Sequence, residues 1–272
     1  MASKKISREA PEGFDQSWLA CRAPYDQEAR SEHLATLAYE TVTQAEYQIV
    51  MDLGCGSGNN VAFLSARWPG VQTWLGVDHD PALVAAATLR FADGKPEFEG
   101  LVADLLDLGE LLGERQPAVL IANAVFDLFT QDMMAEILEV LSISRTPLLS
   151  TLLYTGMVWE DALPDDGWVI GQYEAHMMRQ RPSGRGLGPK APEVIAQLVE
   201  ALGGTLRSEP SLWRVPASDQ HLQGHLLRFM EGSVPEMLSD AASQQRFLSW
   251  LTARRATPSV CTVHHLDQWI TW

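Results

Sequence analysis

The sequence predicts an α/β protein built on a seven-stranded, mostly parallel sheet with helices on both faces. From about residue 46 onward, short apolar runs alternate with segments of helical periodicity, which is the pattern of strands joined by crossover helices. Residues 118–123 form an almost wholly apolar run, as expected of a central strand buried on both faces. The 272 residues suffice to bury a substantial core.

Each predicted strand is an apolar run that ends at a turn or a polar residue. The predicted strands are residues 47–53, 72–78, 97–103, 118–123, 147–154, 205–215 and 259–269. The seventh follows a hairpin-like return, so we expect it to run antiparallel to the others.

Helices are expected between most of these strands. Asp80 is placed as the N-cap of one helix and Pro81 as its first residue, where the missing N–H costs nothing. Another helix begins at Pro192 and carries Val194, Ile195 and Leu198 on one face. The predicted helices are residues 60–68, 81–91, 132–141 and 192–202, with two more at about 219–231 and 240–254.

Two segments lie outside this alternation. Residues 1–45 are interpreted as an N-terminal helical extension, with two helical stretches within 14–43 that are broken near Pro24. Residues 46–272 form the main domain. Within it, residues 155–191 hold Gly, Pro and charged residues with little periodicity, so they are expected to be an insertion with one short helix that covers the substrate.

Composition excludes several classes of protein. A net charge of −15 argues against a nucleic-acid surface. The three cysteines, Cys21, Cys55 and Cys261, are widely spaced and suggest neither a disulfide framework nor a zinc site, so no metal is expected. The N-terminus lacks an apolar signal segment, and no apolar run approaches the length of a membrane span, so we expect a cytoplasmic location.

The most informative stretch is residues 50–60, Val-Met-Asp-Leu-Gly-Cys-Gly-Ser-Gly-Asn-Asn, in which a predicted strand runs into a glycine loop. Glycine allows the backbone to approach a ligand closely because it has no Cβ. The loop lacks the third glycine of the dinucleotide fingerprint, since residue 59 is Asn. The spacing Asp-x-Gly-x-Gly-x-Gly instead resembles motif I of the class I S-adenosylmethionine (SAM)-dependent methyltransferases.

The resemblance extends well over residues 46–154 and loosely over the remainder. It implies a doubly wound, Rossmann-like methyltransferase fold, SAM as the cofactor and S-adenosylhomocysteine as its product. It is closest to the bacterial small-molecule methyltransferases of this class. In that family an N-terminal extension often lies over the cofactor and substrate mouth, so residues 1–45 are expected to act as a lid.

The resemblance also assigns cofactor-binding roles residue by residue. Asp52 corresponds to the acid that orders the glycine loop and the amino group of the ligand, Asp78 to the acid that bridges the ribose hydroxyls, and Asp104 to the acid that meets the adenine. Such acids stand at successive strand ends, where open α/β sheets bind ligands. The implied cofactor residues are Asp52, Gly54, Cys55, Gly56, Gly58, Asn59, Asp78, His79, Asp104, Leu105, Asn123 and Ala124.

The segment after the fourth strand excludes one branch of this family. Methyltransferases that act on exocyclic amino groups of bases or on glutamine side chains carry Asn/Asp-Pro-Pro-Tyr/Phe there. This chain has Asn123-Ala-Val-Phe-Asp127, without the prolines that shape that pocket. Base and glutamine methylation are therefore not expected.

The substrate side is predicted from charge. Residues 176–190 contain Arg179, Arg181, Arg185 and Lys190 and no acid, in a chain that is acidic overall. This segment is either a loop that closes on an anionic substrate, a carboxylate or a phosphate, or a solvated loop whose cations balance nearby acidic surface. Arg22 in the N-terminal extension is a further candidate for substrate binding.

Methyl transfer from a sulfonium is an in-line displacement, so the protein mainly positions the nucleophile and removes its proton where required. The candidate catalytic residues are His176, Asp127 and Tyr173. His176 ranks first because a histidine can accept a proton near neutral pH and this one borders the basic segment. The pair His264-His265 is interpreted as strand surface rather than as metal ligands.

These predictions combine into a SAM-dependent methyltransferase that acts on a small, anionic metabolite. The alternatives are a non-catalytic SAM-binding or scaffold subunit of a heteromeric complex and a methyltransferase that acts on proteins. No nucleic acid or membrane partner is expected. The apolar residues at 269–272 are compatible with core packing or with a homodimer interface.

Overall fold

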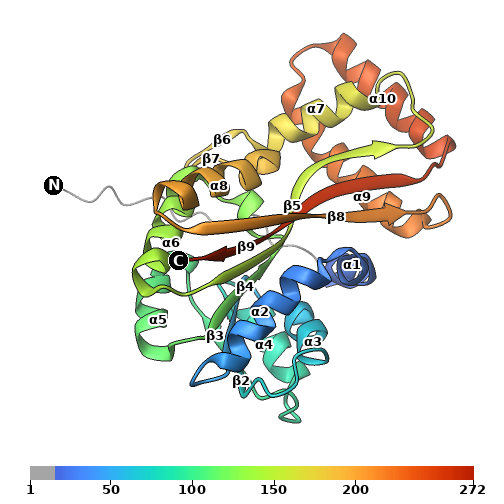
Figure 1. The fold of residues 1–272 in the computed structure, drawn as a ribbon. Helices are drawn as coiled ribbons and strands as arrows, with labels where there is room; N and C mark the ends of the chain where they lie inside the picture. The colour runs from blue at the N-terminus through green and yellow to red at the C-terminus, as the bar shows by residue number, and fades with distance from the viewer. Residues whose placement is uncertain (1–15) are drawn as a thin grey trace.

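In the computed structural model, which describes residues 16–272, a single seven-stranded sheet organises the chain (Figure 1). The strands lie in the order β3-β2-β1-β4-β5-β9-β8. β1 to β5 pair in parallel, and β9 runs antiparallel to both β5 and β8. The predicted seven-stranded, mostly parallel sheet and its antiparallel last strand are therefore confirmed. The strands are β1 Ile49–Leu53, β2 Thr73–Asp78, β3 Phe98–Val102, β4 Val119–Asn123, β5 Leu148–Trp159, β8 Thr205–Val215 and β9 Cys261–Thr271.

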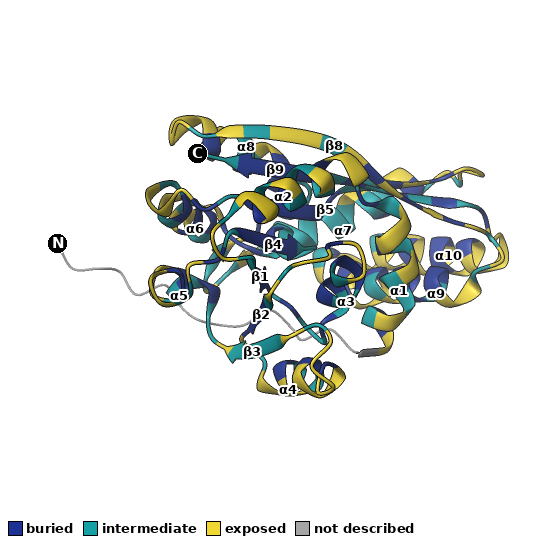
Figure 2. Ribbon diagram, turned by 60° about the horizontal axis from the view of Figure 1, so that its bottom comes forward, coloured by how far each residue is buried: buried dark blue, intermediate teal, exposed yellow. Residues whose placement is uncertain are grey.

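Helices cover both faces of this sheet, because alternate strand residues point to opposite sides and both sides are apolar (Figure 2). On one face, Met51 and Leu53 pack among α5 (Leu108–Arg115), α6 (Gln131–Ser144) and α8 (Ala191–Ala201). On the other face, Val50 packs among α2 (Glu32–Gln44) and α3 (Asn59–Ser65). Trp269 and Ile270 are buried in these two cores, which accounts for the apolar C-terminal segment by core packing within the chain.

A third core lies beyond the main sheet, where β5, β9 and β8 continue as a long ribbon (Figure 1). Helices α7 (Asp166–Met177), α9 (Gln220–Ser233) and α10 (Ala241–Ala256) pack around this end. α1 (Gln16–Ala29) joins them through Trp18, which lies against Trp213 of β8 and Phe229 of α9. No helix within residues 16–272 is long and apolar enough to cross a membrane.

The N-terminal extension differs from its prediction. Its two helices are separated at Ser31, the N-cap of α2, whose side chain accepts a hydrogen bond from the Leu34 N–H at 3.0 Å. Pro24 lies inside α1. Proline removes the N–H that would donate to the carbonyl of Ala20, and both residues are exposed, so water can satisfy that carbonyl instead. The expected break at Pro24 is therefore wrong. Phe14, where the first stretch was expected to start, lies outside the described residues.

The segment predicted as an insertion also differs. β5 continues to Trp159, so residues 155–159 belong to the sheet ribbon. The rest of the segment holds the full-length helix α7 and a small hairpin of β6 (Gln180–Arg181) and β7 (Gly184–Arg185). The register of β5 against β9 shifts between Ser150 and Leu153, where Leu152 has a φ of 58° and its N–H donates to Asp267. α5 was not predicted, and α4 (Pro81–Arg90) begins at Pro81 as expected.

Candidate active site

The candidate active site forms where β1, β2 and β4 end side by side. Leu53 at the end of β1 pairs with Val77 of β2 and with Ala122 of β4. Because these strands are parallel, the segments that follow them all emerge at the same edge of the sheet. The glycine loop, Asp78 and Asn123 are brought together in this way, as the sequence predicted.

The glycine loop is held tightly against its neighbours. The N–H groups of Gly54 and Cys55 donate to the carbonyl of Val77 at 2.8 and 3.0 Å, and the Gly56 N–H donates to Oδ2 of Asp78 at 2.9 Å. Gly54 has a φ of 68°, and a Cβ there would lie 2.8 Å from the side chain of Val125. Only glycine allows both the left-handed backbone and this close approach.

Asp52 lies at the centre of the site and is 1% exposed. Nδ2 of Asn60 donates to its Oδ1 at 2.6 Å, and Nη1 of the buried Arg30 donates to Oδ1 of Asn60 at 2.6 Å. Burial raises the pKa of Asp52 to about 7, against the opposing effects of Asn60 and Arg30. Its Oδ2 has no hydrogen-bond partner within residues 16–272, so a buried acceptor is available to a donor from a ligand.

The two other predicted acids also lie at strand ends. Oδ1 of Asp78 accepts from the N–H of Asp80 at 3.0 Å, and the half-exposed ring of His79 stands 3.4 Å away. Asp104 caps a short 3-10 helix (η1, Leu105–Asp107) through the Leu106 N–H at 3.0 Å, and Leu105 beneath it is buried. A carboxylate oxygen that accepts one backbone N–H, as Oδ2 of Asp78 does from Gly56, can also accept from a ligand hydroxyl.

Two predicted cofactor residues use their side chains to hold the loop. The Cys55 side chain is buried against β2. A Cβ at Gly76 of β2 would lie only 2.9 Å from Sγ of Cys55, so glycine at position 76 makes room for this side chain. Asn59 donates from Nδ2 to the carbonyl of Leu19 at 3.1 Å and accepts from Arg90 at 2.5 Å. Asn59 therefore fastens α1 onto the glycine loop, and any contact with a cofactor at these two positions comes from the backbone.

The segment after β4 borders the opposite side of the site. Oδ1 of Asn123 accepts from the Thr151 hydroxyl at 2.9 Å, and its Nδ2 donates to Asp26 of α1 at 3.3 Å. The next residue, Ala124, adopts a φ of 53°, and its N–H donates to the carbonyl of Thr151. This strained turn directs the chain from the sheet towards η2 (Phe126–Leu128), which carries Asp127.

Among the predicted substrate-binding residues, Arg22 of α1 is the one whose charge acts on Asp127, a predicted catalytic residue. Its guanidinium stands between the rings of Trp18 and Trp213, 5.9 and 5.6 Å from their centroids, and Nε donates to Asp26 at 2.8 Å. Within residues 16–272 its terminal nitrogens have no protein partner. The Arg22 charge reaches Asp127, whose pKa it lowers in opposition to burial.

Asp127 and Tyr173 are a carboxyl and a phenol that act on one another electrostatically, and the charge of Arg22 also acts on Asp127. Burial raises the pKa of Asp127 to about 6, and its Oδ1 has no partner within the described residues. Burial and the charge of Asp127 raise the pKa of Tyr173, so this phenol keeps its proton at physiological pH. Tyr154 lies edge-on to Tyr173, with ring centroids 6.2 Å apart, and its hydroxyl donates to Glu174 at 3.2 Å.

His176, the first-ranked catalytic candidate, is engaged elsewhere. Its Nε2 lies 2.9 Å from Oε2 of Glu236, and its Nδ1 lies 2.9 Å from Nη1 of Arg179. A guanidinium can only donate, so Nδ1 accepts from Arg179 and Nε2 carries the proton that Glu236 accepts. The pKa of His176 is lowered, and burial is the largest cause. Neither ring nitrogen is then free to take a proton from a substrate.

The remaining arginines of the basic segment lie on the β6–β7 hairpin. Arg181 is half-buried at the end of β6, whereas Arg185 is exposed on β7 and donates from Nε to the carbonyl of Met178 at 2.9 Å. A bridge between Thr130 and Gly186 joins the hairpin to the segment after β4. The hairpin therefore borders the site through its backbone.

Sequence reasoning missed several residues of this site. Asn60 and Asp26 are buried polar groups, and Asp26 accepts from Asn123, which lies 97 residues away in the chain. His265 was assigned to the strand surface but is 6% exposed, and burial lowers its pKa to about 3. Its ring lies 4.9 Å from that of Trp213, so a neutral imidazole stands beside the aromatic pair that holds Arg22.

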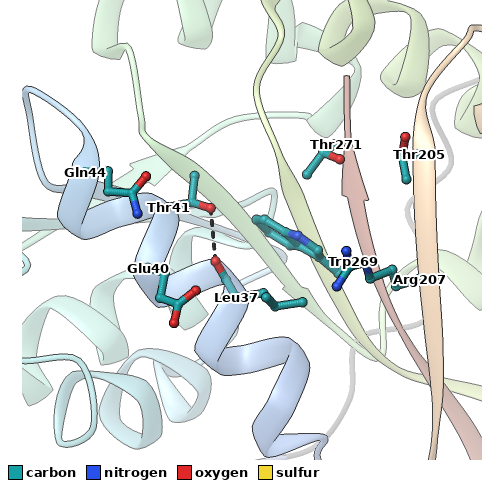
Figure 3. A pocket seen from close by; sticks show the side chains of 8 residues that line it. All are labelled: Leu37, Glu40, Thr41, Gln44, Thr205, Arg207, Trp269 and Thr271. Atoms are coloured by element: carbon teal, nitrogen blue, oxygen red, sulfur yellow. Dashed lines mark hydrogen bonds between the residues drawn. The ribbon is translucent and has the colours of Figure 1, made fainter.

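A separate pocket of about 320 Å3 lies between α2 and the β8–β9 pair (Figure 3). Trp269 forms its wall and pairs with Leu149, the second residue of β5. This places the pocket near the start of β5, away from the strand ends that form the candidate active site. Its other lining residues are mostly polar: Leu37, Glu40, Thr41, Gln44, Thr205, Arg207 and Thr271.

Comparison with known proteins agrees with this geometry. Residues 50–143 match the methyltransferase domain family. The trans-aconitate 2-methyltransferase of Methylobacterium radiotolerans is 35% identical over 78 residues, which are 29% of this chain and 27% of that protein. A protein of the same name from Escherichia coli O17:K52:H18 is 45% identical over 57 residues, 21% of each chain. The chain thus matches about a quarter of the length of these relatives.

Among solved structures, the cyclopropane synthase MmaA2 from Mycobacterium tuberculosis aligns with a TM-score of 0.54 at 16% identity, over 95% of both chains. At this identity the likeness concerns the fold alone. The chain has the Rossmann-like fold of the class I SAM-dependent methyltransferases, and its residues 50–143 are similar to the methyltransferase domain family.

Proposed function

We propose that this protein transfers a methyl group from SAM to a small, anionic metabolite. The observation that carries the proposal is the position of Arg22, whose guanidinium lies between the rings of Trp18 and Trp213, has terminal nitrogens without a partner in residues 16–272, and acts by its charge on the buried Asp127. The relatives named trans-aconitate 2-methyltransferase support an acidic substrate, although the match covers only part of their length.

The residues at the strand ends fit the cofactor. Oδ2 of Asp52, which has no partner within residues 16–272, suits the ammonium group of the ligand. The charge-assisted hydrogen bond between them would offset the cost of removing the ammonium group from water. Gly54 and Gly56 carry no Cβ of their own, so the backbone of the loop can contact an amino-acid tail closely. Asp78 offers carboxylate lone pairs for two hydroxyl donors. When bound, SAM supplies an electrophilic methyl group and a good leaving group.

Arg22 is suited to hold a carboxylate or a phosphate. Asp26 fixes its Nε, and the two tryptophan rings fix the plane of the guanidinium, so the terminal nitrogens are oriented in advance. Two parallel N–H donors match the two oxygens of a carboxylate. Preorganisation of this kind reduces the entropy lost on binding.

Asp127 and Tyr173 can take different parts in the reaction. With a pKa of about 6, Asp127 is mostly ionised at neutral pH and can accept a proton from a hydroxyl or a carbon acid. Tyr173 keeps its proton and can donate a hydrogen bond that orients the acceptor. A carboxylate acceptor needs no base, and in that case Asp127 only positions it.

The test uses purified protein and a panel of small carboxylates, phosphates and their neutral analogues, with methyl transfer from SAM as the readout. We expect turnover with anionic acceptors. Arg22→Lys keeps the charge but loses the bidentate geometry, and should lower kcat/KM about 10-fold or more, mainly through KM. Arg185→Lys, on the exposed hairpin, is the matched control and should change kcat/KM little.

Cofactor binding is measured separately by calorimetric titration of S-adenosylhomocysteine. Wild type and Arg22→Lys should bind it equally, whereas Asp78→Ala should bind it much more weakly. Equal kcat/KM values for Arg22→Lys and wild type, or a preference for the neutral analogues, would contradict the anionic substrate. Failure of folded wild type to bind S-adenosylhomocysteine would contradict the methyltransferase itself.

A further inference from the structure

Cys21, His221 and His225 form a cluster outside the candidate active site. Sγ of Cys21 lies 3.1 Å from Nδ1 of His221, and one ligand atom from each of the three residues can be chosen so that all lie within 4.8 Å of one another. The two histidines are one turn apart on α9, with ring centroids separated by 4.9 Å. Cys21 reaches them from α1, which is 200 residues away in the sequence.

The spacing of these atoms is close to that of a tetrahedral metal site. Zn–S and Zn–N bonds of about 2.3 and 2.0–2.1 Å place neighbouring ligand atoms about 3.3–3.6 Å apart. The distance between Cys21 and His221 already meets this requirement within a few tenths of an ångström. Ligand atoms that lie up to 4.8 Å apart must approach by about 1.2–1.5 Å for zinc to bind, which requires rotation of the exposed His221 or the buried His225 side chain.

We propose that Cys21, His221 and His225 bind a zinc ion that fastens α1 to α9. One thiolate and two imidazoles form a ligand set that zinc prefers over magnesium or calcium, which take oxygen ligands. Three protein ligands leave a fourth position for water. Binding replaces the S–H bond of Cys21 with a Zn–S bond and releases the proton to solvent, with no change of oxidation state.

The charges around the cluster are mixed. Burial, followed by the carboxylate of Asp219, raises the pKa of the Cys21 thiol, while Arg228 acts in the opposite direction. Asp219 is held in place, because it accepts from the Tyr25 hydroxyl at 2.6 Å and from the Leu222 N–H at 2.9 Å. A fixed carboxylate next to the thiol offsets part of the positive charge that a metal brings to the site.

The ion would act on the geometry of α1. Cys21 is next to Arg22 in sequence, and the Trp18 ring packs 5.6 Å from the ring of His225. A metal bond at Cys21 therefore limits the movement of the turn that carries Arg22. The metal site does not depend on the proposed function, since its binding can be measured without cofactor or substrate.

The experiment titrates chelator-treated full-length protein with Co2+, and then displaces the cobalt with Zn2+. We expect one Co2+ per chain, with a thiolate-to-cobalt charge-transfer band that disappears when Zn2+ is added. Cys21→Ser should abolish the band, and His221→Ala should weaken metal binding about 100-fold or more. His221 is exposed, so its replacement should leave the protein folded.

His33→Ala is the matched control. His33 is also exposed on a helix of the N-terminal extension, but its ring nitrogen pairs with Glu209 rather than with a cysteine. The His33→Ala protein should bind Co2+ and Zn2+ as the wild type does. Equal metal binding by wild type, Cys21→Ser and His221→Ala, or no stoichiometric binding by wild type, would overturn the proposal. A comparable loss in His33→Ala would show that the effect is not specific to this cluster and would overturn it as well.

Discussion

Asp52 should set the acid side of the pH dependence of cofactor binding. Burial raises the pKa of this carboxyl to about 7, so below that pH the free protein carries the neutral acid. If Asp52 pairs with the ammonium group of SAM, the carboxyl must first lose its proton. The α-amino group of the ligand loses its own proton near pH 8. Affinity should therefore be greatest between about pH 7 and 8 and decrease on both sides.

The magnitude follows from these two values. Each pH unit below about 7 should weaken binding about tenfold, or about 1.4 kcal/mol, because one proton is released on binding. Asp52→Asn keeps an oxygen for the hydrogen bond from Asn60 but has no charge. A lost charge-assisted hydrogen bond is worth about 1.5–3 kcal/mol, so the variant should bind roughly 10- to 150-fold more weakly at pH 7.5.

The assay is calorimetric titration of S-adenosylhomocysteine from about pH 5.5 to 8.5, in buffers of different ionisation enthalpy so that released protons are counted. Wild type should release one proton per ligand below pH 7, and Asp52→Asn should not. Wild-type affinity that is flat across this range, or an acid limb that persists in Asp52→Asn, would refute the reasoning. Stability of the free protein has its own sign: because the pKa is raised, the contribution of Asp52 is fully present below about pH 4 and is lost as the pH rises through 7.

Two further predictions concern the free energy of unfolding, measured with urea. Gly58→Ala introduces a Cβ 2.7 Å from the Phe91 ring at a φ of 79°, whereas the Cβ of Gly70→Ala meets nothing within 4 Å at a φ of 89°. Gly70→Ala should therefore lower the free energy of unfolding by about 1 kcal/mol and Gly58→Ala by clearly more, and equal losses would contradict the clash. Asp166→Ala leaves the buried Arg254 without its carboxylate partner and should lower the free energy of unfolding by about 3–5 kcal/mol. Asp165→Ala breaks an exposed ion pair with Arg246 and should lower it by less than about 1 kcal/mol. A small loss for Asp166→Ala would show that the buried pair is dispensable.

The sheet and the cofactor edge were predictable because their signals are local. A buried parallel strand needs a continuous apolar run, and the chain must turn where that run ends, so Asp52, Asp78 and Asn123 could be placed at strand ends without knowing the fold. The order of strands then brings those ends together. Helix α5 was not predicted, because Gly109 and Gly113 lower its helix propensity, although its leucines pack in the core.

The substrate side could not be predicted in the same way because its partners are distant in sequence. His176 was favoured for its position beside a run of arginines, yet one of those arginines occupies its Nδ1. Arg22 lies near Asp127 only because α1 folds back over the ends of β8 and β4. The same holds for Cys21 and His221, which come from opposite ends of the chain and show no metal-ligand spacing.

The two helices of the N-terminal extension are held by different forces. α2 buries Leu34, Ala38 and Val42 completely against the sheet, so apolar burial secures it. In α1 the buried residues besides Trp18 include Arg22 and Asp26, which pair with one another and gain little from leaving water.

α1 also contacts the glycine loop, because Nδ2 of Asn59 donates to the carbonyl of Leu19. A metal bond between Cys21 and α9 would add to the contacts that Trp18 of α1 already makes with α9. The zinc proposal and the role of Arg22 thus converge on one turn of one helix, in which Leu19, Cys21 and Arg22 each face a different partner. The apolar residues of α1 do not form a single stripe, so periodicity alone could not predict which of its faces is buried.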